Sequence, residues 1–153
     1  GSAVYGLCLN LDVDGVGKTS MVKVEQVVDD AERLRRIKAS LAALLALLST
    51  KAFGAKRSRF LPIVEVKSVV AAVSSPLPFT VEPPSYTSFI ETTKDKAERF
   101  LAVMERLGIE EEVSLYAFSA ETKVPEGVEE ASSVEELLDK ITEKIMGMLG
   151  GQR

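Results

Sequence analysis

Two short stretches carry residue types that can bind phosphate. Residues 12–20 have the sequence DVDGVGKTS, and their Gly-Lys-Thr ends the loop with which many nucleotide hydrolases hold a triphosphate. Residues 51–60, KAFGAKRSRF, combine four cations, two phenylalanines and a glycine with no acid. The first pattern would serve nucleotide binding, whereas the second has the chemistry of a nucleic-acid contact.

The 12–20 stretch lacks the first glycine of a phosphate-binding loop. The motif G-x-x-x-x-G-K-[ST] puts that glycine at position 12, where the chain has Asp12. Lys18 and Thr19 should also open a helix, but the residues that follow, SMVKVEQVV, favour extended structure. We therefore expect a turn or hairpin tip, and a nucleotide-binding protein that uses Lys18 and Thr19 is the alternative.

The 51–60 stretch suits the backbone of a single-stranded nucleic acid. Arginine binds phosphate bidentately, Ser58 can donate to a phosphate oxygen, phenylalanine stacks on unpaired bases, and Gly54 lets another backbone pass closely. A helix C-terminus with cations that complement its dipole, and with Phe53 and Phe60 in the core, explains the composition equally well. Its four cations are Lys51, Lys56, Arg57 and Arg59.

Composition excludes several classes of site. The chain of 153 residues has no histidine and one cysteine, Cys8, so a histidine-dependent triad, a disulfide framework and a Cys/His zinc site are ruled out. We expect no cofactor, no metal and a reducing, cytoplasmic location. The apolar run at 41–48 is too short to span a membrane, so we expect no membrane partner.

The net charge of −4 hides a division along the chain. Residues 33–67 hold nine basic side chains and one acid, and residues 82–143 hold sixteen acids and six bases. Such a division indicates that one surface meets a polyanion while another faces water or a basic partner. An acidic protein-interaction module is therefore a further alternative. The acidic stretches themselves suit solvated loops and helix starts better than a metal site.

The spacing of apolar residues predicts three strands and three helices in alternation. We expect strands at 3–11, 63–73 and 112–120, with the second in the centre of the sheet, and helices at 31–49, 91–107 and 133–149. Thr92 with Asp95 would cap the middle helix and Gly108 would end it; Ser133 and Glu136 form a capping box. Tyr116 and Phe118 either pack in the core or form a platform for stacked bases.

The stretch LLALLSTKAFGAKRSRFLPIVEVKSVV, followed by PFTVEP and FIETT, closely resembles the DevR-type CRISPR-associated autoregulator family. This family provides the repeated backbone subunit of the archaeal type I-A Cascade effector. It shares the apolar helix, the loop with a glycine and KRSRFLP, the strand, the proline-rich connector and an I-x-T-T motif. The resemblance is strongest over 41–93 and extends back to the first strand.

This resemblance implies a non-enzymatic RNA-binding subunit in antiviral defence. Its partners would be the CRISPR RNA, other copies of the chain and other Cascade subunits, with an oligomer forming in the presence of RNA. The guide bases would supply sequence specificity while the protein holds the backbone. The residues implied in RNA binding are Lys56, Arg57 and Arg59 of the basic motif, together with Lys51, Gly54, Ser58 and Phe60.

The family also implies a fold that this chain contains in part. What matches is the C-terminal half of its members, and a ferredoxin-like palm needs four strands, whereas the sequence predicts three. We therefore expect the α/β (α+β) class: an incomplete RRM-like or ferredoxin-like palm, with three strands and helices packed on the sheet, in a single domain over residues 1–153.

Overall fold

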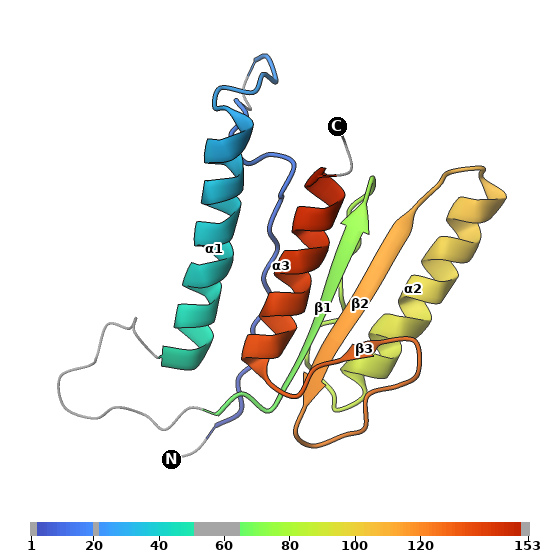
Figure 1. Ribbon diagram of the computed structural model, residues 1–153. Coiled ribbons are helices and arrows are strands. Elements are labelled where there is room, and N and C mark those ends of the chain that lie inside the picture. The colour runs from blue at the N-terminus through green and yellow to red at the C-terminus, as the bar shows by residue number, and fades with distance from the viewer. Residues whose placement is uncertain (1–2, 20–21, 51–64, 151–153) are drawn as a thin grey trace. The chain divides into compact units, whose positions relative to one another are not determined.

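A computed structural model describes residues 3–19, 22–50 and 65–150, which belong to two compact units. The first unit contains residues 3–8 and 65–145, and the second contains the remaining described residues. The first holds the sheet with α2 and most of α3, and the second holds α1 (Figure 1). That residues 1–153 form one domain stays a prediction.

The sheet of the first unit has three strands in the order β1-β2-β3. β1 (Ser68–Ser75) and β2 (Glu112–Ser119) pair antiparallel over their whole length, from Ser68 opposite Ser119 to Ser75 opposite Glu112. β3 (Glu129–Glu130) is a two-residue strand parallel to β2. The sheet is therefore mixed, and β2 is its central strand.

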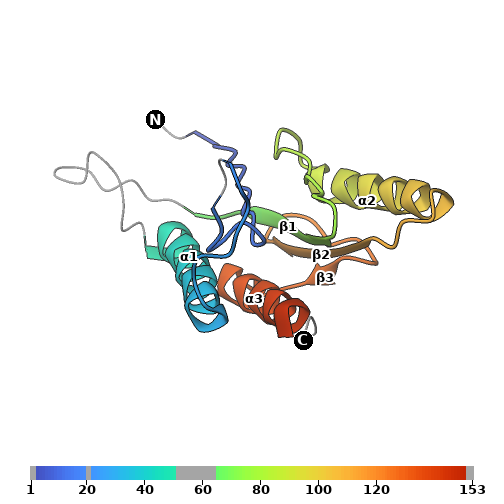
Figure 2. The same cartoon turned by 90° about the horizontal axis from the view of Figure 1, so that it is seen from above.

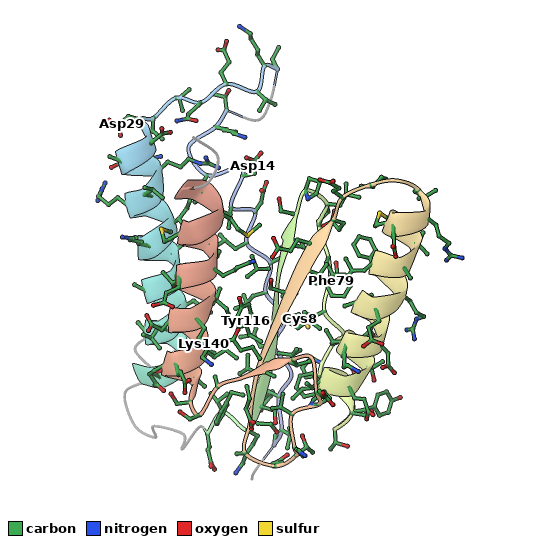
Figure 3. All side chains as sticks on the ribbon, turned by 45° about the vertical axis from the view of Figure 1, so that its right-hand side comes forward. Cys8, Asp14, Asp29, Phe79, Tyr116 and Lys140 are labelled. Carbon is green, nitrogen blue, oxygen red and sulfur yellow. The ribbon has the colours of Figure 1, made fainter. Side chains whose placement is uncertain are left out.

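One face of this sheet is covered by α2 (Phe89–Arg106). Alternate residues of β1 and β2, such as Ala72 and its partner Leu115, point toward that helix because strand side chains alternate between faces. Phe89, Ile90 and Ala97 of α2 complete the core with Ala117, Val124 and Val128. Phe79 of the preceding connector stacks on Phe100 with 5.6 Å between ring centroids (Figure 3).

The opposite face of the sheet lies toward α3 (Val134–Gly150), as Figure 2 shows for the part of the helix in the first unit. Tyr116 points to this face and is 5% exposed, and burial raises the pKa of its hydroxyl. A ring buried to this extent is not available for stacking on bases. Tyr116 is therefore a core residue, as the more conservative interpretation of the sequence has it.

The predicted fold class is confirmed, with helices packed on a three-stranded sheet. Two strand predictions are wrong in detail. Residues 3–11 form no strand, because none of the described residues supplies the backbone partner that an extended segment needs. The strand expected at 63–73 begins at Ser68 and lies at an edge of the described sheet, not at its centre.

The second unit is built on α1 (Asp30–Thr50), which the apolar spacing located within one residue at each end. Asp29 caps its start, because a carboxylate oxygen accepts the Glu32 N–H at 2.8 Å. The buried positions, Ile37 and Leu41, lie one turn apart. The second, more apolar half of α1 is less covered, and Leu47 is 41% exposed.

The C-terminus of α2 ends at Gly108 as predicted. Gly108 has φ +70°, its N–H donates to the Glu105 carbonyl, and the Ile109 N–H donates to the Met104 carbonyl, both at 3.0 Å. These two bonds are the pair that defines a Schellman motif, which requires a left-handed residue after the last helical turn. The start of α2 differs from the prediction: the N-cap is Ser88, without a side-chain bond, and not Thr92.

Two glycine substitutions should change stability in opposite directions. Gly108→Ala lowers the free energy of unfolding by about 1 kcal/mol, since an alanine is strained at positive φ even though open space surrounds its Cβ. Gly147→Ala, in α3 and also facing open space, raises it by up to about 1 kcal/mol because alanine favours the helix. Urea unfolding measures both; equal changes for the two variants would contradict the assigned cap.

The start of α3 carries the predicted capping residues, with one bond shifted. The Glu136 N–H donates to the Ser133 hydroxyl at 3.1 Å, and the Glu136 carboxylate accepts the backbone N–H of Ser132 at 2.8 Å, one residue before the expected position. Hydrogen bonds from the Ser132 hydroxyl and backbone, then from Lys140, lower the pKa of Glu136 to about 2.

This lowered pKa predicts a defined loss of stability in acid. The carboxylate has a lower pKa when folded, so its contribution is complete above the ordinary value of 4.5 and disappears as the pH falls toward 2. Wild-type protein should lose more stability between these two pH values than Glu136→Gln, as followed by urea unfolding at each pH. Glu143→Gln, an exposed position on the same helix, is the control; a wild-type profile that matches Glu136→Gln would refute the cap's contribution.

Candidate functional site

The predicted RNA-binding residues lie outside the described residues. They are Lys51, Gly54, Lys56, Arg57, Ser58, Arg59 and Phe60, all within the 51–64 range that the structure leaves undescribed. The elements on either side are described: α1 ends at Thr50, and β1 begins at Ser68. The basic segment therefore connects a helix of the second unit to the sheet of the first, and its role in RNA binding stays a prediction.

Basic residues in the described part of the same charged stretch have internal partners. Glu32 of α1 accepts hydrogen bonds from Arg35 and Arg36, which lower its pKa to about 2. Lys67 pairs with Glu65 at 2.7 Å. Arg35 nevertheless has 75% of its side chain exposed. Lys38, on the exposed side of α1, was counted in the sequence charge but was given no role there.

The glycine-rich stretch forms a hairpin-like turn rather than the entrance to a helix. Residues 13–17 are a turn, Lys18 bridges antiparallel to Gln26, and α1 starts only at Asp30. A phosphate-binding loop needs the helix directly after the lysine and threonine, so that its N-terminal amides face the phosphates. The expected turn or hairpin tip is confirmed for the described residues of this stretch.

The two side chains that would contact a nucleotide are engaged within this turn. The Lys18 ammonium lies 2.6 Å from a carboxylate oxygen of Asp14, and that hydrogen bond lowers the pKa of Asp14. The Thr19 hydroxyl donates to the Lys23 carbonyl at 2.6 Å and accepts the Glu25 N–H. Arg33 also reaches Asp14, at 3.4 Å (Figure 3 labels Asp14). A triphosphate would have to displace all of these contacts.

The acidic segments serve local ion pairs in the described structure. Lys140 of α3 lies 3.1 Å from Glu129 and 3.3 Å from Glu136, and it also donates to the Glu130 carbonyl at 2.9 Å (Figure 3 labels Lys140). These contacts fix β3 against the start of α3. Among the described residues, no three Cys, Asp or Glu side chains are grouped closely enough to hold a metal ion.

The helices of the described ranges were also compared with the length and hydropathy of a membrane span. None of those helices is long and apolar enough to cross a bilayer. Even α1, with its run of leucines and alanines, has charged residues in its first two turns.

Known proteins are similar to this chain over most of its length. A CRISPR-associated protein Cas7/Cst2/DevR of Methanocaldococcus jannaschii is 34% identical over 145 residues, which are 94% of this chain and 41% of the relative. A CRISPR-associated aCascade subunit Cas7/Csa2 of Saccharolobus solfataricus is 32% identical over 148 residues, 94% of this chain and 44% of the relative. The chain therefore spans less than half the length of these relatives.

The family itself is given by a match over the first part of the chain. Residues 1–94 fit the model of the CRISPR-associated negative auto-regulator DevR/Csa2 family. This range contains the turn at 12–19, α1, the basic segment, β1 and the beginning of α2. With more than half of its residues in this match, the chain belongs to the DevR/Csa2 family of CRISPR-associated proteins.

Proposed function

We propose that this chain is a non-enzymatic RNA-binding backbone subunit, or part of one, of an archaeal type I-A Cascade effector in antiviral defence. The observation that carries the proposal is the coincidence of the family match with the basic segment: residues 1–94 fit the DevR/Csa2 model and contain KAFGAKRSRF. One relative, from Saccharolobus solfataricus, bears the name of an aCascade subunit.

The CRISPR RNA is the polyanion that the basic segment is proposed to hold. Lys56, Arg57 and Arg59 would bind phosphates, because arginine forks and lysine ammonium groups form strong charge-assisted hydrogen bonds with phosphate oxygens. Lys51 and Ser58 would add phosphate contacts, and Phe60 would stack on a base. Because such contacts involve the backbone, affinity would be independent of RNA sequence.

Assembly and location follow from the same proposal. The partners are the CRISPR RNA, other copies of the chain and other Cascade subunits, and oligomers form when RNA is present. We place this assembly in the cytoplasm, where CRISPR RNA would be met. The turn at 12–19 favours no second function, since Lys18 and Thr19 already bind within the turn.

Salt dependence of RNA binding tests the proposal directly. Fluorescence anisotropy with two labelled single-stranded RNAs of equal length and unrelated sequence should give equal affinities. With three cations at phosphates, the plot of log affinity against log salt concentration should have a slope of about −2. Absence of binding at low salt, or a strong preference for one sequence, would refute the proposed backbone grip.

A further inference from the structure

A shallow groove lies between the C-terminal half of α2 and the turn that leads into β2 (Figure 1). Its apolar lining comes from Leu101, Met104 and Ile109, of which Ile109 is 39% exposed. The other lining residues are mostly acidic: Glu98, Glu105, Glu110, Glu111 and Glu112. An apolar floor with a carboxylate rim is the surface to which a basic, partly apolar segment would be complementary.

The carboxylates of this groove are incompletely neutralised. Glu98 pairs with Lys94 at 3.0 Å, and Glu112 pairs with Lys144. Among the residues that the structure describes, Glu105, Glu110 and Glu111 form no ion pair. Even the neighbouring cation, Arg106, donates its Nε–H to the Ala102 carbonyl at 3.2 Å rather than to a carboxylate.

One oxygen of the groove also lacks a hydrogen bond. Glu111 accepts the Leu77 N–H with Oε2 at 3.0 Å, but its Oε1 is buried and has no partner among the described residues. Leaving a buried charged acceptor without a donor is unfavourable, so a donor supplied from outside would be stabilised there. A guanidinium offers the geometry that a carboxylate accepts best.

The exposed face of α1 has the complementary composition. Arg35, Lys38, Ala39 and Ala42 share one side of this helix by their spacing, and all four are exposed. Ile37 and Leu41 lie on the opposite side and are buried. The two cations match the carboxylate rim, and the alanines next to them let the helix lie close to an apolar floor, because interaxial distances fall with side-chain size.

We propose that the groove between α2 and β2 binds the exposed face of α1 of a second copy of this chain. Arg35 and Lys38 of one copy meet Glu105, Glu110 and Glu111 of the other. The two surfaces differ, so the contact is head-to-tail and leaves a free groove at one end and a free α1 at the other, which allows further copies to add. This association needs no RNA and goes beyond the proposed RNA grip.

Sedimentation velocity of nuclease-treated protein over a range of concentrations tests this contact. Wild-type protein should show a concentration-dependent mass above the 16.6 kDa of one chain. The groove variant Glu105→Lys/Glu110→Lys and the helix variant Arg35→Glu/Lys38→Glu should each associate about tenfold more weakly or less, because like charges then face each other. A mixture of the two variants restores association, since each reversed surface finds an opposite charge.

Matched controls separate this result from a general effect of charge. Glu121→Lys/Glu126→Lys makes the same change of charge in the exposed loop before β3 and should associate like wild type. RNA affinity of the groove variant should not fall, which keeps this inference distinct from the proposed function. The inference is overturned if wild type stays monomeric up to about 1 mM, where a contact of about 4 kcal/mol would be half formed, or if the mixed variants fail to associate.

Discussion

Replacing Arg57 and Arg59 together by glutamate should lower the affinity for single-stranded RNA by about 100-fold or more. Hydrogen bonds to charged groups contribute about 1.5–3 kcal/mol each, and the substitution removes two such donors and adds two repelling charges. The slope of log affinity against log salt concentration should become shallower as well, because fewer counterions are released. Anisotropy titrations at several salt concentrations measure both quantities.

The matched control makes the same change of charge elsewhere on the chain. Arg99 of α2 and Lys123 of the loop after β2 are exposed, and Arg99→Glu/Lys123→Glu should leave RNA affinity within about threefold of wild type, as weak long-range repulsion is screened by salt. Circular dichroism should show that both double variants stay folded. Equal losses in the two variants would mean that net charge, rather than the basic segment, governs binding.

The helices of this protein were predictable because their signals are local. The start of α3 depends on Ser133 and Glu136, three residues apart, and the end of α2 depends on one glycine after the last apolar turn. The apolar spacing itself places the buried residues of α3 on one side, as the structure confirms for Leu137, Ile141 and Ile145. No distant residue is needed to interpret such patterns.

The strands were less predictable because pairing depends on distant residues. The alternation at 3–11 suits a strand, yet Tyr5 is 89% exposed and Leu9 57%, since no described strand pairs with this segment. β3 was missed altogether: Glu129 and Glu130 have no strand propensity, and their pairing beside Tyr116 results from the loop that returns to β2. Period two identifies a segment that can pair but not its partner.

The functional chemistry divides in the same way. That Lys18 and Thr19 do not form a nucleotide site followed from one missing glycine, and the structure adds the Asp14 contact that occupies the lysine. The charge division along the chain indicated a basic partner for the acidic part, but not where that partner would bind. The groove brings Glu98 and Glu110 together from opposite sides of a turn, which only the path of the chain after Gly108 produces.

Leu137→Ala should produce the largest loss of stability among single core substitutions, about 2–5 kcal/mol in the free energy of unfolding. Leu137 of α3 is 1% exposed, so its truncation removes buried methyl groups and leaves a cavity that the surroundings fill only in part. Such a loss is a large fraction of the 5–15 kcal/mol typical of a domain. Urea unfolding followed by circular dichroism measures it.

The same substitution at an exposed position separates burial from helix effects. Leu107→Ala, at a residue 64% exposed, should change the free energy of unfolding by less than about 0.5 kcal/mol. RNA affinity of Leu137→Ala, measured at low temperature where the variant is folded, should equal that of wild type, because α3 is not part of the proposed basic contact. A loss of RNA affinity without a loss of stability would assign α3 a direct role in binding, whereas the reverse result supports a division of labour in which α3 completes the core and the segment at 51–60 holds RNA.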